Sequence, residues 1–155
     1  MINYFSECLL GGLLFLALVS GCGGPPPIFP ISGKVTLGGK PYERLLVYFR
    51  PAKGDVNAFN LGVGETDKNG ELKLSSSGGQ GISAGEYRVT FSCVYLKSNG
   101  KSVSSTEKPD DAGGGVVSVE RVKSPYDAAT SQEITPVTFV VKKGENKFEF
   151  DIPAK

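Results

Sequence analysis

The chain has 155 residues, enough for one domain and little else. It contains no histidine and no tryptophan, and its formal net charge is only +1. The absence of histidine excludes Ser-His and Cys-His catalytic pairs, and the balanced charge leaves no electrostatic footprint for nucleic acid. The sequence leaves a Ser-Lys pair and a carboxylate pair open, but no Ser-x-x-Lys run has a helical context. We expect a protein that is neither an enzyme nor a nucleic-acid-binding protein.

The first 21 residues form an apolar segment typical of a signal peptide. The run from Cys8 to Ser20 has the length of a signal-peptide core and is shorter than the roughly 20 apolar residues that a membrane span needs. It ends in small residues followed by Cys22, so we predict a signal peptide over 1–21 that is cleaved before Cys22. No Lys or Arg precedes the run, so either the start codon is misassigned or export depends on the apolar run alone.

The sequence Leu-Val-Ser-Gly-Cys at residues 18–22 resembles the lipobox of bacterial lipoproteins. This resemblance implies that the Cys22 thiol carries diacylglycerol, with acyl chains such as palmitate, and that the protein is anchored in a membrane. An uncleaved anchor and an ordinary secreted protein are the alternatives. Gly23 stands where Gram-negative lipoproteins of the inner membrane usually carry Asp, so the resemblance favours the outer membrane, facing the periplasm.

Residues 22–30 form the predicted tether, rich in glycine and proline. Proline-rich linkers extend by about 3.1 Å per residue, so this tether reaches only about 25 Å. We expect the domain over 31–155 to lie close to the membrane surface.

From Ile31 onward the sequence alternates between short strands and glycine-rich turns, and it lacks helical periodicity. Seven strands are predicted, over residues 31–37, 45–50, 61–66, 71–74, 86–96, 137–141 and 147–152. Gly38-Gly39 predicts a tight turn, and Asn69-Gly70 predicts a hairpin with a primed turn. Strands with one apolar face must pack face to face, so we predict an all-β, seven-stranded sandwich.

The segment from Lys97 to Thr135 interrupts this rhythm and is rich in Ser, Gly, Lys and Asp. A long segment without predicted structure inside a small domain is usually functional or disordered. We therefore expect a long flexible insertion at about 97–135, in which residues 116–119 are a candidate edge strand.

Three stretches together resemble the carboxypeptidase regulatory-like, transthyretin-like domain: Ile31–Pro41, Gly64–Leu74 and Ala84–Thr90. The segment Ser124–Ser131 and the strands after it are also similar to small lipoproteins of planctomycete-type bacteria. The resemblance implies a Greek-key sandwich in the cell envelope. Domains of this family typically serve as binding, spacer or stability modules and carry no catalytic site.

Few residues are candidates for metal or catalytic chemistry. Asp67, Asn69 and Glu71 offer oxygens to Ca²⁺, but this cation prefers six to eight oxygen ligands, so a plain turn is the favoured interpretation. Asp110 and Asp111 are interpreted as part of a solvated loop. Cys93 falls on the apolar side of a strand and is expected to be a small buried hydrophobe. We predict no metal and no cofactor.

The preferred hypothesis is a non-enzymatic, membrane-anchored protein-binding or structural module of the envelope. Its partner, an envelope protein or polymer, would be contacted through the insertion or through a sheet edge. The alternative is a small-ligand or carbohydrate-binding module, for example one that binds peptidoglycan. Its candidate stacking rings are Tyr42, Tyr48 and Tyr126, although tyrosines in strands commonly pack on a half-buried sheet.

Overall fold

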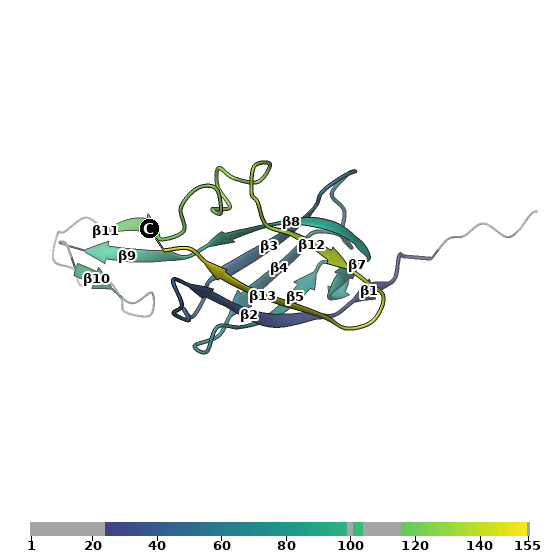
Figure 1. The fold of residues 1–155 in the computed structure, drawn as a ribbon, viewed down its shortest axis with the longest axis horizontal. Helices are drawn as coiled ribbons and strands as arrows, with labels where there is room; N and C mark the ends of the chain where they lie inside the picture. Colours follow the sequence, from purple (N-terminus) through teal and green to yellow (C-terminus); the bar gives the residue numbers. More distant parts are fainter. Residues whose placement is uncertain (1–23, 99–100, 104–115, 155) are drawn as a thin grey trace, which may run out of the picture.

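Figure 1 shows the computed structural model, which describes residues 24–98, 101–103 and 116–154. These residues form strands and turns without any helix, which confirms the all-β prediction. No helix that could cross a membrane is therefore present in this part of the chain. The predicted signal peptide and Cys22 lie outside the described residues.

The main sheet is a continuous path of strands in the order β12-β8-β3-β4-β5-β2-β13, with β6 paired to β5. Neighbouring strands are antiparallel except β2 and β13, which are parallel. The bounds are β2 Ile31–Leu37, β3 Leu46–Pro51, β4 Gly62–Thr66, β5 Glu71–Ser76, β6 Gly79–Gln80, β8 Gly85–Ser92, β12 Thr138–Val141 and β13 Asn146–Ile152. Each of the seven predicted strands has a counterpart in this path.

Two smaller sheets lie beside the main one. Strand β1 (Ile28–Phe29) pairs with β7 (Ile82–Ser83). Strand β9 (Val94–Ser98) lies between β10 (Lys101–Val103) and β11 (Val116–Glu120). The residues of β1 belong to the predicted tether, so the domain takes up the end of that segment.

The main sheet curls on itself, so that its two end strands come close together. The ring of Phe148 in β13 lies 5.1 Å from that of Phe49 in β3 and 5.3 Å from that of Phe139 in β12. The predicted strands therefore form one nearly closed, barrel-like sheet, where two separate sheets were expected. Its inner face is the core, whose largest fully buried side chains are Tyr87, Phe49, Phe91, Leu45, Leu72, Leu74, Ile82 and Ile152.

Two glycines on the inner face of β4 permit this curl. A Cβ atom at Gly62 would lie 2.6 Å from Cδ2 of Leu74, and one at Gly64 would collide with Cδ1 of Leu72. Because β4 is the middle strand of the path, the missing side chains let the two halves of the inner face approach each other there.

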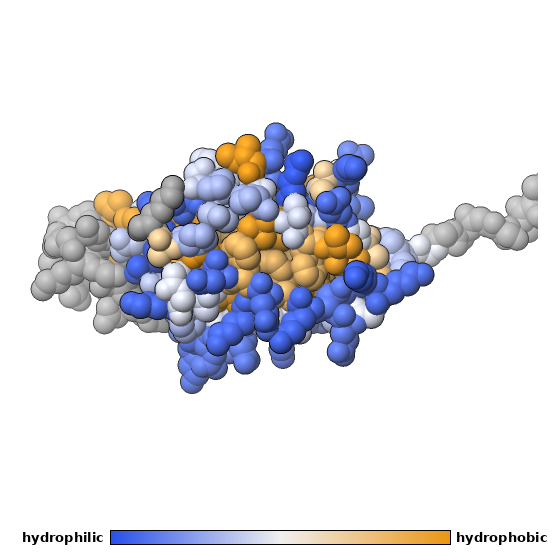
Figure 2. All heavy atoms as spheres, in the orientation of Figure 1, coloured by the Kyte–Doolittle hydropathy of each residue, from blue (hydrophilic) through white to orange (hydrophobic). Residues whose placement is uncertain are grey.

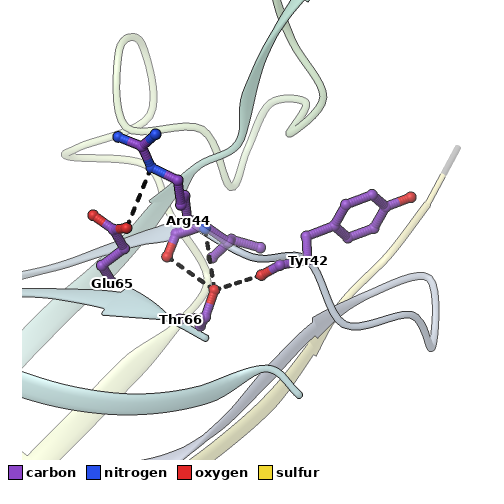
Figure 3. A network of polar contacts seen from close by, with 5 residues as sticks. Tyr42, Arg44, Glu65 and Thr66 are labelled. Atoms are coloured by element: carbon purple, nitrogen blue, oxygen red, sulfur yellow. Dashed lines mark hydrogen bonds and ion pairs between the residues drawn. The ribbon is translucent and has the colours of Figure 1, made fainter. Parts of the chain in front are cut away.

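The Thr66 hydroxyl fixes the corner between the turn after β2 and the start of β3 (Figure 3). Its Oγ1 donates to the Tyr42 carbonyl at 2.6 Å and accepts the Leu45 N–H at 3.1 Å. Nearby, Arg44 has a φ of 64° and its Nε lies 3.4 Å from Glu65. A buried threonine with its hydroxyl bonded in this way holds the loop between β2 and β3, which is not part of a strand.

The hairpin at Asp67–Gly70 forms where predicted, but its turn type differs from the expectation. A primed turn needs positive φ at both central residues. Here only Gly70 has a positive φ, at 80°. The Asp67 N–H donates to the Glu71 carbonyl, and the Asp67 carbonyl accepts the Gly70 N–H. The geometry is that of a type I turn followed by a left-handed glycine. Lys68 and Asn69 therefore avoid the positive φ values that a primed turn would impose on them.

The strand predicted over 86–96 is divided at Cys93 into β8 and β9. The Glu120 carboxylate accepts the Cys93 N–H at 2.7 Å and the Ser92 hydroxyl at 2.6 Å. The Arg121 guanidinium lies over the Tyr95 ring, 3.9 Å from its centroid. These contacts interrupt the main-sheet ladder and start the three-stranded arm β9–β11, which projects from one end of the domain (Figure 1).

Part of the expected flexible insertion packs on the main sheet. The Phe91 N–H of β8 donates to the Tyr126 carbonyl, and the Ala128 N–H donates back to the Phe91 carbonyl. Val122 and Ser131 are fully or almost fully buried. The described residues 116–135 thus form a strand followed by a segment that covers the edge of β8 beyond β12. Composition alone does not reveal this packing, because backbone hydrogen bonds and polar side chains hold the segment.

Candidate functional site

The best candidate for a binding surface is the gap between the two ends of the curled sheet, which we call the seam. Strand β12 pairs only with β8 and β13 only with β2, and no ladder joins β12 to β13 among the described strands. The two strands follow each other in the chain and are linked by the short turn 142–145. Consecutive strands with so short a link usually pair, so this hairpin is splayed.

The seam is a groove of about 490 Å³ with an aromatic floor. It is lined by Pro136, Val137, Thr138, Phe139, Lys147, Phe148, Glu149 and Phe150. Phe139 and Phe150 are partly exposed, while Phe148 between them is 4% exposed. Figure 2 shows apolar side chains gathered in the middle of this face, over the region where β12, β8 and β13 lie in Figure 1. Core rings therefore reach the surface here.

Both sides of the seam offer backbone groups without a strand partner. The Val89 N–H of β8 donates to the Val137 carbonyl, and alternation along an antiparallel pair then turns the peptide groups of Thr138 and Val140 away from β8. On the other side, the Asn146 N–H donates to the Pro30 carbonyl, so Lys147 and Glu149 turn their peptide groups away from β2. These four residues face the seam with backbone donors and acceptors that bond to no other residue in the described part of the chain.

A second hollow, of about 360 Å³, lies on the outer face of β3 and β8 under the packed segment. It is lined by Tyr48, Arg50, Thr90, Ser92, Ala128, Ala129 and Gln132. Of the three tyrosines that are candidates for sugar stacking, Tyr48 borders this hollow. The Tyr42 ring packs beside Arg121 at 5.2 Å, and the Tyr126 ring packs on Phe150 at 6.1 Å.

A larger hollow of about 830 Å³ lies over β2, β4, β5 and β13, and its walls are charged. Lysines and carboxylates alternate there, and the ammonium of Lys147 is 2.6 Å from the carboxylate of Glu149. The pKa of Glu149 is lowered chiefly by its hydrogen bond from Lys147, and that of Lys147 is raised by the same bond. The charges on this face are largely balanced by each other, so it offers no distinct ligand chemistry.

The candidate calcium residues form a turn. One Asp67 carboxylate oxygen accepts the N–H groups of Glu71 at 2.9 Å and Asn69 at 2.8 Å. The Glu71 hydrogen bond is the main cause that lowers the pKa of Asp67. No group of three or more Cys, Asp or Glu residues suited to a metal gathers within the described ranges. Asp110 and Asp111 lie outside the described residues.

Cys93 is 5% exposed, as expected of a small buried hydrophobe. Burial raises the pKa of its thiol, with the Arg121 charge opposing this effect. A buried thiol with a raised pKa is a poor nucleophile. The candidate lipidation site, Cys22, is outside the described residues; residues 24–30 are the described part of the tether, and Gly24–Pro27 within it are exposed.

Sequence reasoning did not find the seam or the hollow at Tyr48. Both depend on which strands lie side by side, and alternation within each strand does not give that order. No protein-family model matches this chain, and a search of curated proteins finds no match.

Proposed function

We propose that this protein is a non-enzymatic lipoprotein of the bacterial cell envelope whose β-domain binds another protein. In this proposal Cys22 carries the lipid, and the protein is anchored in the outer membrane, facing the periplasm. We also propose that the curled sheet is a variant of the transthyretin-like sandwich, with β4 joining the two layers. The order of the strands and the three motif stretches support this relation.

The observation that carries the binding role is the seam. An open sheet edge binds extended segments by adding a strand, where main-chain hydrogen bonds give affinity and side-chain pockets give specificity. The seam has two such edges, with an aromatic floor between them. The occupant that fits is one extended strand of an envelope protein, with apolar side chains at every second position. Such a strand would complete the nearly closed sheet.

The tether and the fold suggest how the domain is oriented. Because β1 takes up Ile28 and Phe29, only six residues, 22–27, separate the lipid from the domain, a reach of about 19 Å. The Pro30 carbonyl accepts the Asn146 N–H, so the turn between β12 and β13 lies beside the tether. The arm β9–β11 lies at the opposite end of the domain (Figure 1). We infer that the arm points away from the membrane.

The anchor has a direct test. A Cys22→Ser variant is expected to lose labelling by fatty acid completely and to accumulate as the unprocessed precursor, because the acceptor thiol is gone. Cys8→Ser is the matched control and should keep both labelling and processing, since residue 8 leaves with the signal peptide. Normal processing of Cys22→Ser would make the protein an ordinary secreted one.

Site-specific photocrosslinking in cells tests the seam. Crosslinkers placed at residues 140 and 147 lie on its two sides, and one at residue 73 lies on an exposed part of β5 as the control. We expect a discrete adduct from the first two positions and none from the third. An adduct of twice the chain mass would identify a second copy as the occupant and contradict an envelope partner. The same adducts from position 73, or none at all, would contradict binding at the seam.

A pair of variants separates strand addition from side-chain contact. Val140 is 55% exposed, and its N–H faces the seam, so Val140→Pro removes one free donor without removing a β8 hydrogen bond. Val140→Lys changes the side chain and keeps the donor. Crosslinking from residue 147 should fall several-fold in the proline variant and persist in the lysine variant. Equal crosslinking in both would exclude main-chain pairing.

A small-ligand or carbohydrate-binding role is the second candidate function, and one observation favours it. The Tyr48 ring borders the hollow on the outer face of β3 and β8, with Arg50 beside it. Pockets for small molecules occupy roughly 300–1,000 Å³, and this hollow of about 360 Å³ is within that range.

A further inference from the structure

Two arginines lie directly opposite each other on the outer face of the main sheet. Arg50 of β3 and Arg88 of β8 are register partners, and both side chains are partly buried. Opposite residues on neighbouring strands have their Cβ atoms about 4.5–5.5 Å apart, and like charges in such a pair destabilise the sheet. Their side by side placement therefore needs a compensating interaction.

The described part of the chain does not supply that interaction. Neither guanidinium forms a hydrogen bond there or has a carboxylate within 4.0 Å. Glu86, on the same face of β8 and two residues from Arg88, is exposed and forms no ion pair with it. Glu120, which lies near the far end of the hollow, already accepts hydrogen bonds from Ser92, Cys93 and Val122.

The surroundings of the pair define a small polar site. Tyr48 and Thr90 are the next register partners along the same face, and both border the hollow together with Arg50. Gln132 covers it from the packed segment, and its amide nitrogen donates to the Ala128 carbonyl, which leaves its side-chain oxygen free to accept a bond. The hollow thus combines the guanidinium of Arg50, one aromatic ring and neutral polar groups, and Arg88 lies next to Arg50 on the neighbouring strand, beside the residues that line the hollow.

We propose that this site binds an anionic sugar. The acidic group, a carboxylate or a phosphate, would be held by Arg50 and Arg88, whose planar forks match such oxyanions. The sugar ring would lie against Tyr48 and bond to Gln132. This inference rests on the second candidate function and names its ligand class. It does not depend on the seam, which is on a different part of the sheet.

The test is calorimetric titration of the full chain in a neutral detergent with four probes: glucuronic acid, glucose 6-phosphate, glucose and inorganic phosphate. We expect saturable binding of one or both acidic sugars, and binding of glucose at least about tenfold weaker, because glucose lacks the charged group. The acidic sugar that binds identifies the oxyanion. Binding of inorganic phosphate as tight as that of the sugars would reduce the site to a simple anion site and overturn the sugar assignment.

Variants link any binding to the two arginines. Arg50→Gln and Arg88→Gln should each weaken the acidic sugar at least about tenfold, whereas Lys73→Gln, which removes the same charge from exposed β5, should not change affinity. Without ligand, each arginine variant should melt at or above the wild-type temperature, because a repulsion is relieved. A lower melting temperature would mean that the pair is structural and would overturn the proposal.

Two further outcomes separate this inference from the function on which it rests. Binding of glucose and acidic sugars with equal affinity, unaffected by the arginine variants, would keep a carbohydrate-binding role and exclude this site. If no probe binds saturably, both the acidic-sugar site and the carbohydrate-binding role are contradicted. Neither outcome bears on crosslinking at the seam.

Discussion

Replacing Gly33 with valine is expected to destabilise the domain by more than about 3 kcal/mol, one of the largest effects of any single change outside the core. Gly33 lies in β2 opposite Phe148 of the parallel strand β13. A Cβ atom built at Gly33 would collide with the carbonyl group of Phe148. That group is backbone and cannot rotate away, so β2 and β13 must separate. The measurement is the free energy of unfolding from urea denaturation.

Gly24→Val is the matched control for this prediction. A Cβ atom at Gly24 meets nothing within 4 Å, and its backbone is outside the left-handed region. The control should therefore unfold with the wild-type midpoint. A Gly33→Val variant that is as stable as the control would show that β13 does not approach β2 so closely, and the seam would then need a different position.

The strands of this domain were predictable because their apolar residues alternate. Val47 and Phe49 in β3 and Val89 and Phe91 in β8 are all fully buried, as alternation requires. Alternation also placed Cys93 on the inner side. What alternation leaves open is the order of the strands, because every predicted strand has one apolar face and fits several neighbours. The seam and the arginine pair follow from that order.

The segment 116–135 shows a second limit of sequence reasoning. It is rich in polar and charged side chains, with three serines and two threonines, and it has little apolar periodicity. In the structure Asp127 and Ser131 are buried, and the hydrogen bonds that hold them are local. Side chains that bond to nearby backbone give no periodic signal. A packed polar segment and an open loop therefore look alike in sequence.

The break at Cys93 has a similar cause. In residues 86–96, Tyr87, Val89, Phe91, Cys93 and Tyr95 share one face, so the sequence predicts a single strand. The carboxylate of Glu120, 27 residues later in the chain, accepts a hydrogen bond from the Cys93 N–H. The strand is divided at this residue. A long-range polar contact can thus override local propensity.

Asp127 is expected to be the most important polar residue of the packed segment. It is 7% exposed, and its carboxylate accepts the Ser131 hydroxyl at 2.6 Å, the Thr130 hydroxyl at 2.7 Å and the Thr130 N–H at 2.9 Å. Asp127→Ala removes all three bonds and leaves their donors without this acceptor. We expect a loss of about 2–4 kcal/mol in the free energy of unfolding at pH 7, since hydrogen bonds to charged groups contribute about 1.5–3 kcal/mol each and are not additive.

Glu133→Gln is the control for charge in the same segment. Glu133 is exposed, and its replacement should leave the unfolding midpoint unchanged at pH 7. If Asp127→Ala were as stable as Glu133→Gln, the segment 121–135 would not be held by this carboxylate, and its cover over β8 would need another cause.

The effect of Asp127 should also depend on pH, in a direction that its environment fixes. Burial favours the neutral form, but the hydrogen bonds from Ser131 and Thr130 together outweigh it, so the pKa of Asp127 is lowered from its usual value of 3.8. A carboxyl with a lower pKa in the folded state stabilises the fold above its unfolded pKa, and this contribution is lost as the pH falls through the folded value. The difference in unfolding free energy between wild type and Asp127→Ala should therefore be constant from pH 6 to 8 and shrink below about pH 4. A difference that stays constant down to pH 2, measured by urea denaturation at each pH, would show that shape rather than charge gives Asp127 its effect.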